Sequence, residues 1–220
     1  MRANEFLTEG KSMPVIVVDV QPEYANYGNN AAVCHNIVTF VVNQTGPVLF
    51  FANAENTGVS GDTIYDIKRY WEDEVYEYSG EYDDPYQDPN FKEPIDWSRF
   101  TLVDKGYGYL RSWHDQGVDD TVIVNAIRLM YQAKVNDSRE LFGGEDSDTY
   151  EQGMRDLLGD DYLIGMGDTI SVGWASVAQL KKFNGAYLVG GGRNECLWEV
   201  KVLMNAFNIR YKMIDSLVYG

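Results

Sequence analysis

Residues 13–22 read MPVIVVDVQP, and this stretch decides the fold. Four β-branched residues follow Pro14 without a polar interruption, which is typical of a strand covered on both faces in a parallel sheet. The run ends in Asp19, followed by Gln21 and Pro22. The sequence therefore indicates an α/β protein whose first strand is buried inside the sheet.

Outward from this strand, short apolar runs alternate with stretches of helical periodicity. The predicted strands are residues 48–52, 100–103, 186–190 and 210–214, and the predicted helices are residues 30–43, 63–74 and 197–207. This alternation predicts a doubly wound, mostly parallel sheet with flanking helices, and we expect residues 1–220 to form a single domain.

Two segments interrupt this pattern. Residues 72–96 hold ten acidic side chains against one base, Lys92, which predicts a solvated polar excursion or, alternatively, a lid or a partner surface. Residues 106–183 are predicted to form a helical insertion between strands three and four. Within it we expect helices at 119–134, 148–158 and 174–182, and a short strand at 162–166.

Composition excludes several classes of partner. The 34 acidic against 18 basic side chains give a net charge of −16, which disfavours nucleic acid and anionic membranes. No apolar run approaches the about 20 residues that span a bilayer, and residues 1–12 lack the long apolar stretch of a secretory signal, so we expect neither feature. Two distant cysteines, Cys34 and Cys196, favour a reducing compartment. We therefore expect a cytoplasmic protein, and its general resemblance to viral or phage proteins would place it in the host cytoplasm.

Three reactive residues follow predicted strands: Asp19, Lys105 and Cys196. Because the carboxyl ends of parallel strands share one edge, we expect these three residues to meet. A helix N-terminus and the ammonium of Lys105 would both favour the thiolate of Cys196, and the carboxylate of Asp19 could accept the thiol proton. Backbone amides of the Gly191-Gly192-Arg193 turn and of Cys196 are the predicted oxyanion donors.

This arrangement resembles the isochorismatase-like cysteine hydrolases, which include nicotinamidases and related amidases. The resemblance covers about residues 13–104 and 186–214. It implies that Asp19 is the base, that Lys105 orients and stabilises charge, and that Cys196 is the nucleophile. It also implies a non-proline cis peptide near Gly191-Gly192, and a homo-oligomer.

The chain departs from the family in two places. Residues 53–62 contain none of the histidines through which nicotinamidase-type members hold a metal, so we expect neither a metal nor another cofactor. The family's small, Thr-rich segment before the cysteine is replaced by residues 193–195, which predicts a different pocket. The pocket residues that we predict are Gln21, Tyr107, Tyr109, Trp113, His114 and Asn194.

Each of these residues also has a purely structural interpretation. Cys196 is alternatively a small buried hydrophobic residue, Asp19 a helix cap, and Lys105 a surface lysine. The aromatic residues after Lys105 are alternatively a packing patch, and His35 is interpreted as structural.

The leading hypothesis is a cysteine-dependent hydrolase that acts on an amide, or on a related C–N or ester-like bond, of a small molecule. The second is a non-catalytic binding or interaction protein on the same scaffold. The third is a nucleotide-binding protein that uses the glycines at 190–192 to cradle a phosphate.

Overall fold

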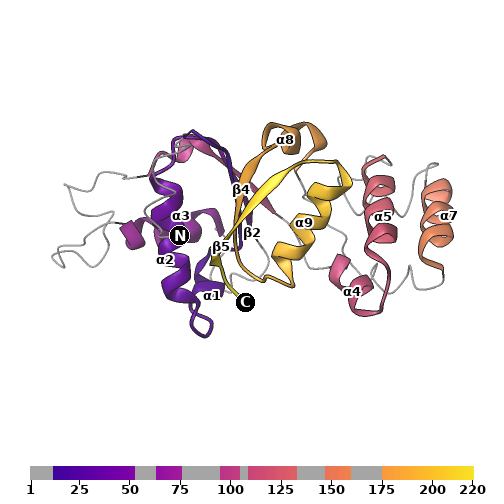
Figure 1. Ribbon diagram of the computed structural model, residues 1–220, viewed down its shortest axis with the longest axis horizontal. Helices are drawn as coiled ribbons and strands as arrows, with labels where there is room; N and C mark the ends of the chain where they lie inside the picture. The colour runs from indigo at the N-terminus through magenta and orange to yellow at the C-terminus, as the bar shows by residue number, and fades with distance from the viewer. Residues whose placement is uncertain (1–11, 53–62, 76–94, 105–108, 133–146, 160–174) are drawn as a thin grey trace.

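Strand β1, Val15–Val18, lies in the middle of a five-stranded sheet with the order β3-β2-β1-β4-β5 (Figure 1). The computed structural model describes residues 12–52, 63–75, 95–104, 109–132, 147–159 and 175–220. All the neighbouring pairs of strands in this sheet are parallel. The other strands are β2 (Val48–Ala52), β3 (Phe100–Asp104), β4 (Ala186–Gly190) and β5 (Tyr211–Val218).

Helices cover both faces of the sheet (Figure 1). One face carries α1 (Pro22–Ala25), α2 (Asn30–Val42) and α3 (Thr63–Val75). On the other side lie α4 (Tyr109–Asp115), α5 (Asp120–Gln132), α7 (Ser147–Leu158) and α9 (Cys196–Ala206). Of these, α9 lies next to the sheet, and α5 and α7 follow at increasing distance from it (Figure 1). The remaining described helices are the short 3₁₀ turn η3 (Trp97–Arg99) and α8 (Val177–Lys182).

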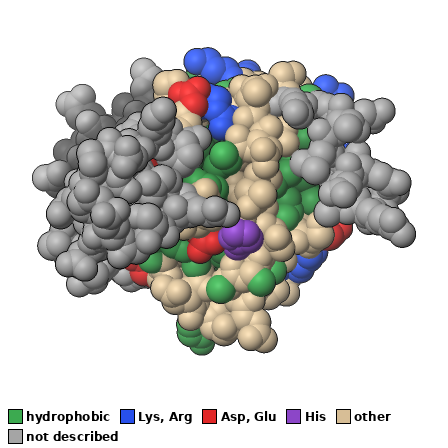
Figure 2. All heavy atoms as spheres, turned by 90° about the vertical axis from the view of Figure 1, so that its left-hand side faces the viewer, with side chains coloured by type: hydrophobic (Ala, Val, Ile, Leu, Met, Phe, Trp, Pro, Cys, Tyr) green, Lys and Arg blue, Asp and Glu red, His purple; other side chains and the backbone are tan. Residues whose placement is uncertain are grey.

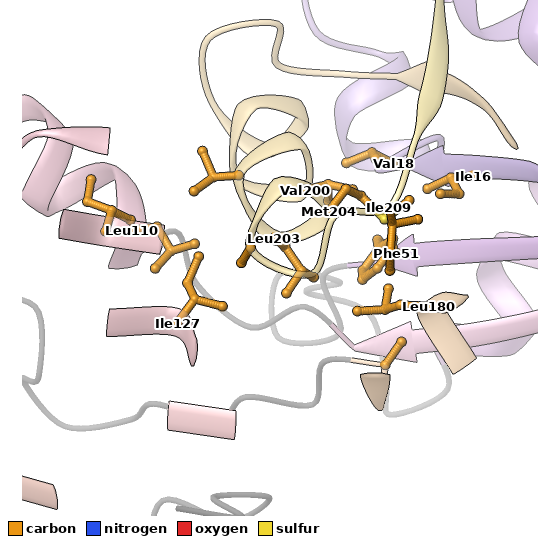
Figure 3. Packing of buried hydrophobic residues seen from close by; sticks show 14 of the residues in the cluster. Ile16, Val18, Phe51, Leu110, Ile127, Leu180, Val200, Leu203, Met204 and Ile209 are labelled. Atoms are coloured by element: carbon orange, nitrogen blue, oxygen red, sulfur yellow. The ribbon is translucent and has the colours of Figure 1, made fainter. Parts of the chain in front are cut away.

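The central strand divides the core into two clusters because successive side chains of a strand point to opposite faces. Val15 and Val17 pack in one cluster with residues of α2 and α3. Ile16 and Val18 pack in the other, with residues of α9 such as Val200 and with residues farther out (Figure 3). All four residues of β1 are fully buried, as expected for a strand covered on both faces.

The predicted strands at 48–52 and 186–190 are confirmed with the same bounds. Strand β3 runs one residue farther than predicted, and β5 starts at Tyr211 and runs on to Val218. The short helix α4 was not predicted. The strand expected at 162–166 lies outside the described residues.

The acidic segment at 72–96 needs a correction at both ends. Its first four residues belong to α3, and Glu72 is buried at 1 % exposure, where it accepts a 2.7 Å hydrogen bond from Trp97 Nε1. Ile95 is also buried, at 3 % exposure. Glu72 and Ile95 therefore belong to the folded core rather than to a solvated loop, and residues 76–94 lie outside the described part of the chain.

The side of the molecule that carries α2 and α3 shows small, separate groups of hydrophobic and of basic side chains (Figure 2). On α2, His35 Nδ1 lies 2.7 Å from Glu74 Oε2 of α3. No helix in the described ranges is both long enough and apolar enough to cross a membrane.

Candidate functional site

A pocket of about 340 Å³ opens at the carboxyl ends of β1, β4 and β5. This is the edge at which α/β sheets bind ligands, because loops and helix N-termini meet there. It gathers residues from four parts of the sequence. The described lining residues are Asp19, Tyr24, Tyr27, Asn30, Arg111, Gly191, Gly192, Arg193, Asn194, Glu195, Cys196, Tyr219 and Gly220.

Asp19 has a left-handed backbone, with φ of 55°, immediately after the buried strand β1. This conformation is uncommon for residues other than glycine and is found more often for Asp than for most. Three hydrogen bonds hold it: the Asp19 amide donates to Phe51 O (2.9 Å), and the Asp19 carbonyl accepts from the Gln21 amide (2.9 Å) and from Tyr219 Oη (2.6 Å). Asp19 as a whole residue is 2 % exposed.

Cys196 is the first residue of α9 and is only partly buried. It therefore combines access to the pocket with the positive end of a helix dipole, a setting that favours a thiolate. The other cysteine, Cys34, is fully buried in α2, and burial, with a smaller contribution from Glu74, raises its pKa to about 12. Of the two thiols, only Cys196 lines the pocket.

Three consecutive glycines, Gly190 to Gly192, lead from the end of β4 towards Cys196. At each of them a larger residue would clash or would be strained. A Cβ on Gly190, where φ is +121°, would lie 2.1 Å from Val18 O of the adjacent strand. A Cβ on Gly191 would lie 1.8 Å from Tyr219 Cζ, and Gly192 has φ of +65°. The turn thus depends on close approaches that only glycine permits.

The predicted oxyanion donors are only partly compatible with this turn. The Gly191 amide donates to Val18 O (2.9 Å) and the Arg193 amide donates to Tyr219 O (3.2 Å), so both are already used within the fold. Within the turn, the amides of Gly192 and Asn194 have no hydrogen-bond acceptor among the described residues. The cis peptide expected near Gly191-Gly192 is absent, because the described peptide bonds are all trans.

The segment from α1 to α2 supplies a wall of the pocket that the sequence did not reveal. Tyr24, Tyr27 and Asn30 line it, and Asn30 Nδ2 donates a 3.1 Å hydrogen bond to the Tyr24 carbonyl. Tyr27 is 78 % exposed, so its ring stands at the rim. The sequence signal for this wall was its position between the Asp-x-Gln-Pro that follows β1 and the start of α2.

Arg111 of α4 also lines the pocket and was missed. Its guanidinium forms ion pairs with Glu195, directly before Cys196, and with Asp115, and its amide donates to Glu199 Oε1 (3.2 Å). The hydrogen bond to Glu195 raises the pKa of Arg111 further above its ordinary value. Arg111 therefore ties the helical insertion to the first turn of α9.

Asn194 lines the pocket as predicted, but several other predicted pocket residues lie elsewhere. Gln21 is fully buried and donates to Glu23 Oε2 (3.1 Å), and Trp113 is a core residue at 1 % exposure. The His114 ring lies against Trp198 at a tilt of 39°, with ring centroids 4.5 Å apart, and its Nδ1 lies 3.3 Å from Asp120 Oδ1.

The burial of Trp113 fits the packing interpretation, whereas the His114 side chain is 46 % exposed beside Trp198. Tyr109 is the first residue of α4, and Tyr107 lies outside the described residues.

Lys105 also lies outside the described residues, but its neighbour Asp104 is placed. Asp104 is the last residue of β3 and pairs with Ala52 of β2. One residue earlier, Val103 pairs with Phe51, which pairs on its other side with Val18 of β1. By this register, β3 ends level with Asp19, two strands away. Among the described residues, no group of three or more His, Cys, Asp or Glu is arranged to hold a metal ion.

Together, the sheet order, the helices on both faces and the pocket define an α/β protein with a five-stranded parallel sheet. Comparisons of the chain with protein-family models, with curated proteins and with solved structures give no match.

Proposed function

We propose that the protein is a cysteine-dependent hydrolase of small amides, or of related C–N or ester-like bonds, and a divergent relative of the isochorismatase-like hydrolases. One observation carries the proposal: a carboxylate, Asp19, and a thiol at a helix N-terminus, Cys196, line the same pocket. The carboxylate belongs to a backbone that is held in an uncommon conformation, which is typical of functional sites.

In the first half of the proposed reaction, the Asp19 carboxylate takes the proton of the Cys196 thiol. Sγ attacks the carbonyl carbon of the substrate, and the negative charge moves to the carbonyl oxygen. The C–N bond then breaks, Asp19 returns its proton to the leaving nitrogen, and a thioester remains on Cys196. Lys105, by the resemblance, stabilises the charges that form.

In the second half, Asp19 takes a proton from a water molecule that attacks the thioester carbonyl. The C–S bond breaks, the carboxylic acid leaves, and Asp19 returns the proton to the sulfur, which restores both groups. We assign the oxyanion to the amides of Gly192 and Asn194, because the amides of Gly191, Arg193 and Glu195 are already engaged within the fold. An amide donor aimed at the developing oxyanion is worth about 3 kcal/mol.

The same turn argues against the nucleotide-binding alternative. A phosphate cradle needs several amides that point into the pocket, whereas the amides of Gly191 and Arg193 donate to the backbone carbonyls of Val18 and Tyr219. The Asp19 carboxylate also lines the pocket, and the two guanidinium groups in the lining, those of Arg111 and Arg193, form ion pairs with Glu195 and Asp215. We therefore do not propose nucleotide binding.

The proposal is tested with 4-nitrophenyl acetate as an ester probe and with a panel of small primary amides followed by ammonia release. We expect Cys196→Ala to lower kcat/KM by at least about 1,000-fold and Asp19→Asn by at least about 100-fold. Far-UV circular dichroism checks that both variants keep the fold. Hydrolysis that Cys196→Ala retains in full would exclude the mechanism.

Cys34→Ala is the matched control, because it removes the buried thiol and leaves the pocket intact. Iodoacetamide should label Cys196 near neutral pH at least about tenfold faster than it labels glutathione, and should leave Cys34 unlabelled. If Cys196 reacts no faster than glutathione and no probe is hydrolysed, the non-catalytic binding alternative replaces this proposal.

A further inference from the structure

Tyr219, the residue that follows β5, contacts both halves of the candidate site. Its hydroxyl donates a 2.6 Å hydrogen bond to the carbonyl oxygen of Asp19, 200 residues away in the sequence. Its ring lies against Gly191, where a Cβ would come within 1.8 Å of the ring, and its carbonyl accepts from the Arg193 amide at 3.2 Å. One side chain therefore joins the end of β1 to the turn that carries Cys196.

The hydrogen bond matters because of the conformation of Asp19. A non-glycine residue with φ of 55° persists only where its surroundings hold it. Two of the three bonds that hold Asp19 are backbone bonds, made with Phe51 and Gln21, and the third is the bond from Tyr219. Of these three bonds between described residues, the third comes from a side chain, so a substitution can remove it.

Tyr219 is well placed to hold Asp19 throughout a reaction. It is 7 % exposed, so water competes poorly for its hydroxyl. Burial first, and the nearby charge of Asp19 second, raise the pKa of Tyr219 above its ordinary value. The hydroxyl therefore stays protonated and remains a donor at every pH at which a thiol hydrolase works.

We propose that Tyr219 is a positioning residue, whose hydroxyl fixes the Asp19 backbone so that the carboxyl group faces the thiol of Cys196. This inference rests on the proposed function, in which Asp19 moves the proton of that thiol. Tyr219 itself takes part in no bond-making step. Small errors in the placement of such a base lower the rate steeply, by as much as about 100-fold for a displacement of 1 Å.

The variant is Tyr219→Phe, which removes the hydroxyl and keeps the ring against Gly191. Its matched control is Tyr131→Phe, because Tyr131 Oη on α5 also donates to a backbone carbonyl, that of Ala175, at 2.9 Å. The pocket-lining residues include Tyr219 and not Tyr131. Any loss common to both variants is therefore a general effect of removing such a hydrogen bond.

With 4-nitrophenyl acetate, we expect Tyr219→Phe to lower kcat by about 10- to 100-fold with little change in KM, and Tyr131→Phe to change neither. The second readout is the pH profile of Cys196 alkylation by iodoacetamide. Tyr219→Phe should move this profile in the direction of the Asp19→Asn profile, and Tyr131→Phe should leave it at the wild-type position.

The outcomes separate the two proposals. If the wild type hydrolyses the probe through Cys196 and Tyr219→Phe keeps both its kcat and its alkylation profile, the positioning role is refuted and the hydrolase stands. If the wild type hydrolyses no probe but Asp19→Asn alters the alkylation profile, the hydrolase fails, and the Tyr219→Phe profile still decides the positioning role. If Asp19→Asn also leaves that profile unchanged, both proposals are refuted.

Discussion

The contact between Gly191 and Tyr219 gives a direct test of the architecture of the site. In Gly191→Ala, the new Cβ would lie 1.8 Å from Tyr219 Cζ, 2.0 Å from Cε2 and 2.1 Å from Oη. The methyl group and the ring cannot both occupy this space, so the ring must leave its position. Gly191 is not among the residues with positive φ, so the penalty is steric rather than conformational.

The expected loss has two parts. Overpacking of a well-packed site costs about 1–3 kcal/mol. Displacing the ring also breaks the hydrogen bond from Tyr219 to Asp19, which is worth about 1–2 kcal/mol. We therefore expect Gly191→Ala to lower the free energy of unfolding by about 2–5 kcal/mol, measured by urea denaturation with tryptophan fluorescence.

Two comparisons make this prediction specific. Gly28→Ala is the control, since its Cβ would meet no atom within 4 Å, so the expected loss comes from its φ of +60° alone and is about 1–2 kcal/mol. In a Tyr219→Ala background, Gly191→Ala should cost less than about 0.5 kcal/mol, because the three nearest atoms to the new Cβ all belong to Tyr219. An equal cost in both backgrounds, or a loss in the wild type no larger than that of Gly28→Ala, would contradict the contact.

Three further predictions concern other parts of the molecule. The folded state raises the Cys34 pKa from 9.0 to about 12, so above about pH 9 the unfolded chain loses a proton that the folded chain keeps. The free energy of unfolding should thus fall as pH rises from about 9 towards 12, and Cys34→Ala should flatten that fall in urea titrations at several pH values; an unchanged slope would contradict the burial of the thiol. Arg111→Met should lower the free energy of unfolding by less than about 1 kcal/mol, because both carboxylate partners of Arg111 are more than half exposed. The same substitution should alter the rate of Cys196 alkylation. An unaltered rate would show that Arg111 does not order the turn before α9. Trp71→Phe removes a 2.7 Å hydrogen bond from Nε1 to Val20 O and leaves a cavity among packed aromatic rings. Thermal unfolding should therefore report a loss of about 2–3 kcal/mol in the free energy of unfolding. A loss below about 1 kcal/mol would refute this packing.

Strands inside the sheet could be predicted closely from the sequence, because burial on both faces selects an unbroken apolar run. Residues 48–52 and 186–190 are such runs. Gly46-Pro47 marks the start of the first run, and Gly191-Gly192 marks the end of the second. The edge strand β5 was harder. Its exposed Asp215 and Ser216 interrupt the apolar pattern, so the strand was predicted to end at Ile214.

The candidate site was predictable only in part, for a physical reason. Asp19 and Cys196 follow strands whose carboxyl ends share one edge, so their positions in the sequence were informative. The part played by Tyr219 depends on the parallel pairing of β5 with β4, which places this residue beside a strand end 200 residues away. No local pattern encodes that contact. Trp113 was misassigned because an aromatic cluster looks the same in sequence whether it packs in the core or lines a pocket.

The distribution of pocket residues along the chain has a consequence for folding. The walls come from residues 19–30, 111, 191–196 and 219–220, so the cavity needs contacts between segments that are very distant in sequence. Contacts of this kind form late, because closing long loops costs chain entropy before any packing is gained. A partly folded chain with a complete β1 and β2 would have the wall from residues 19–30 and would lack the walls from residues 111, 191–196 and 219–220. During refolding, the environment of Cys196 should therefore form after the first collapse of the chain.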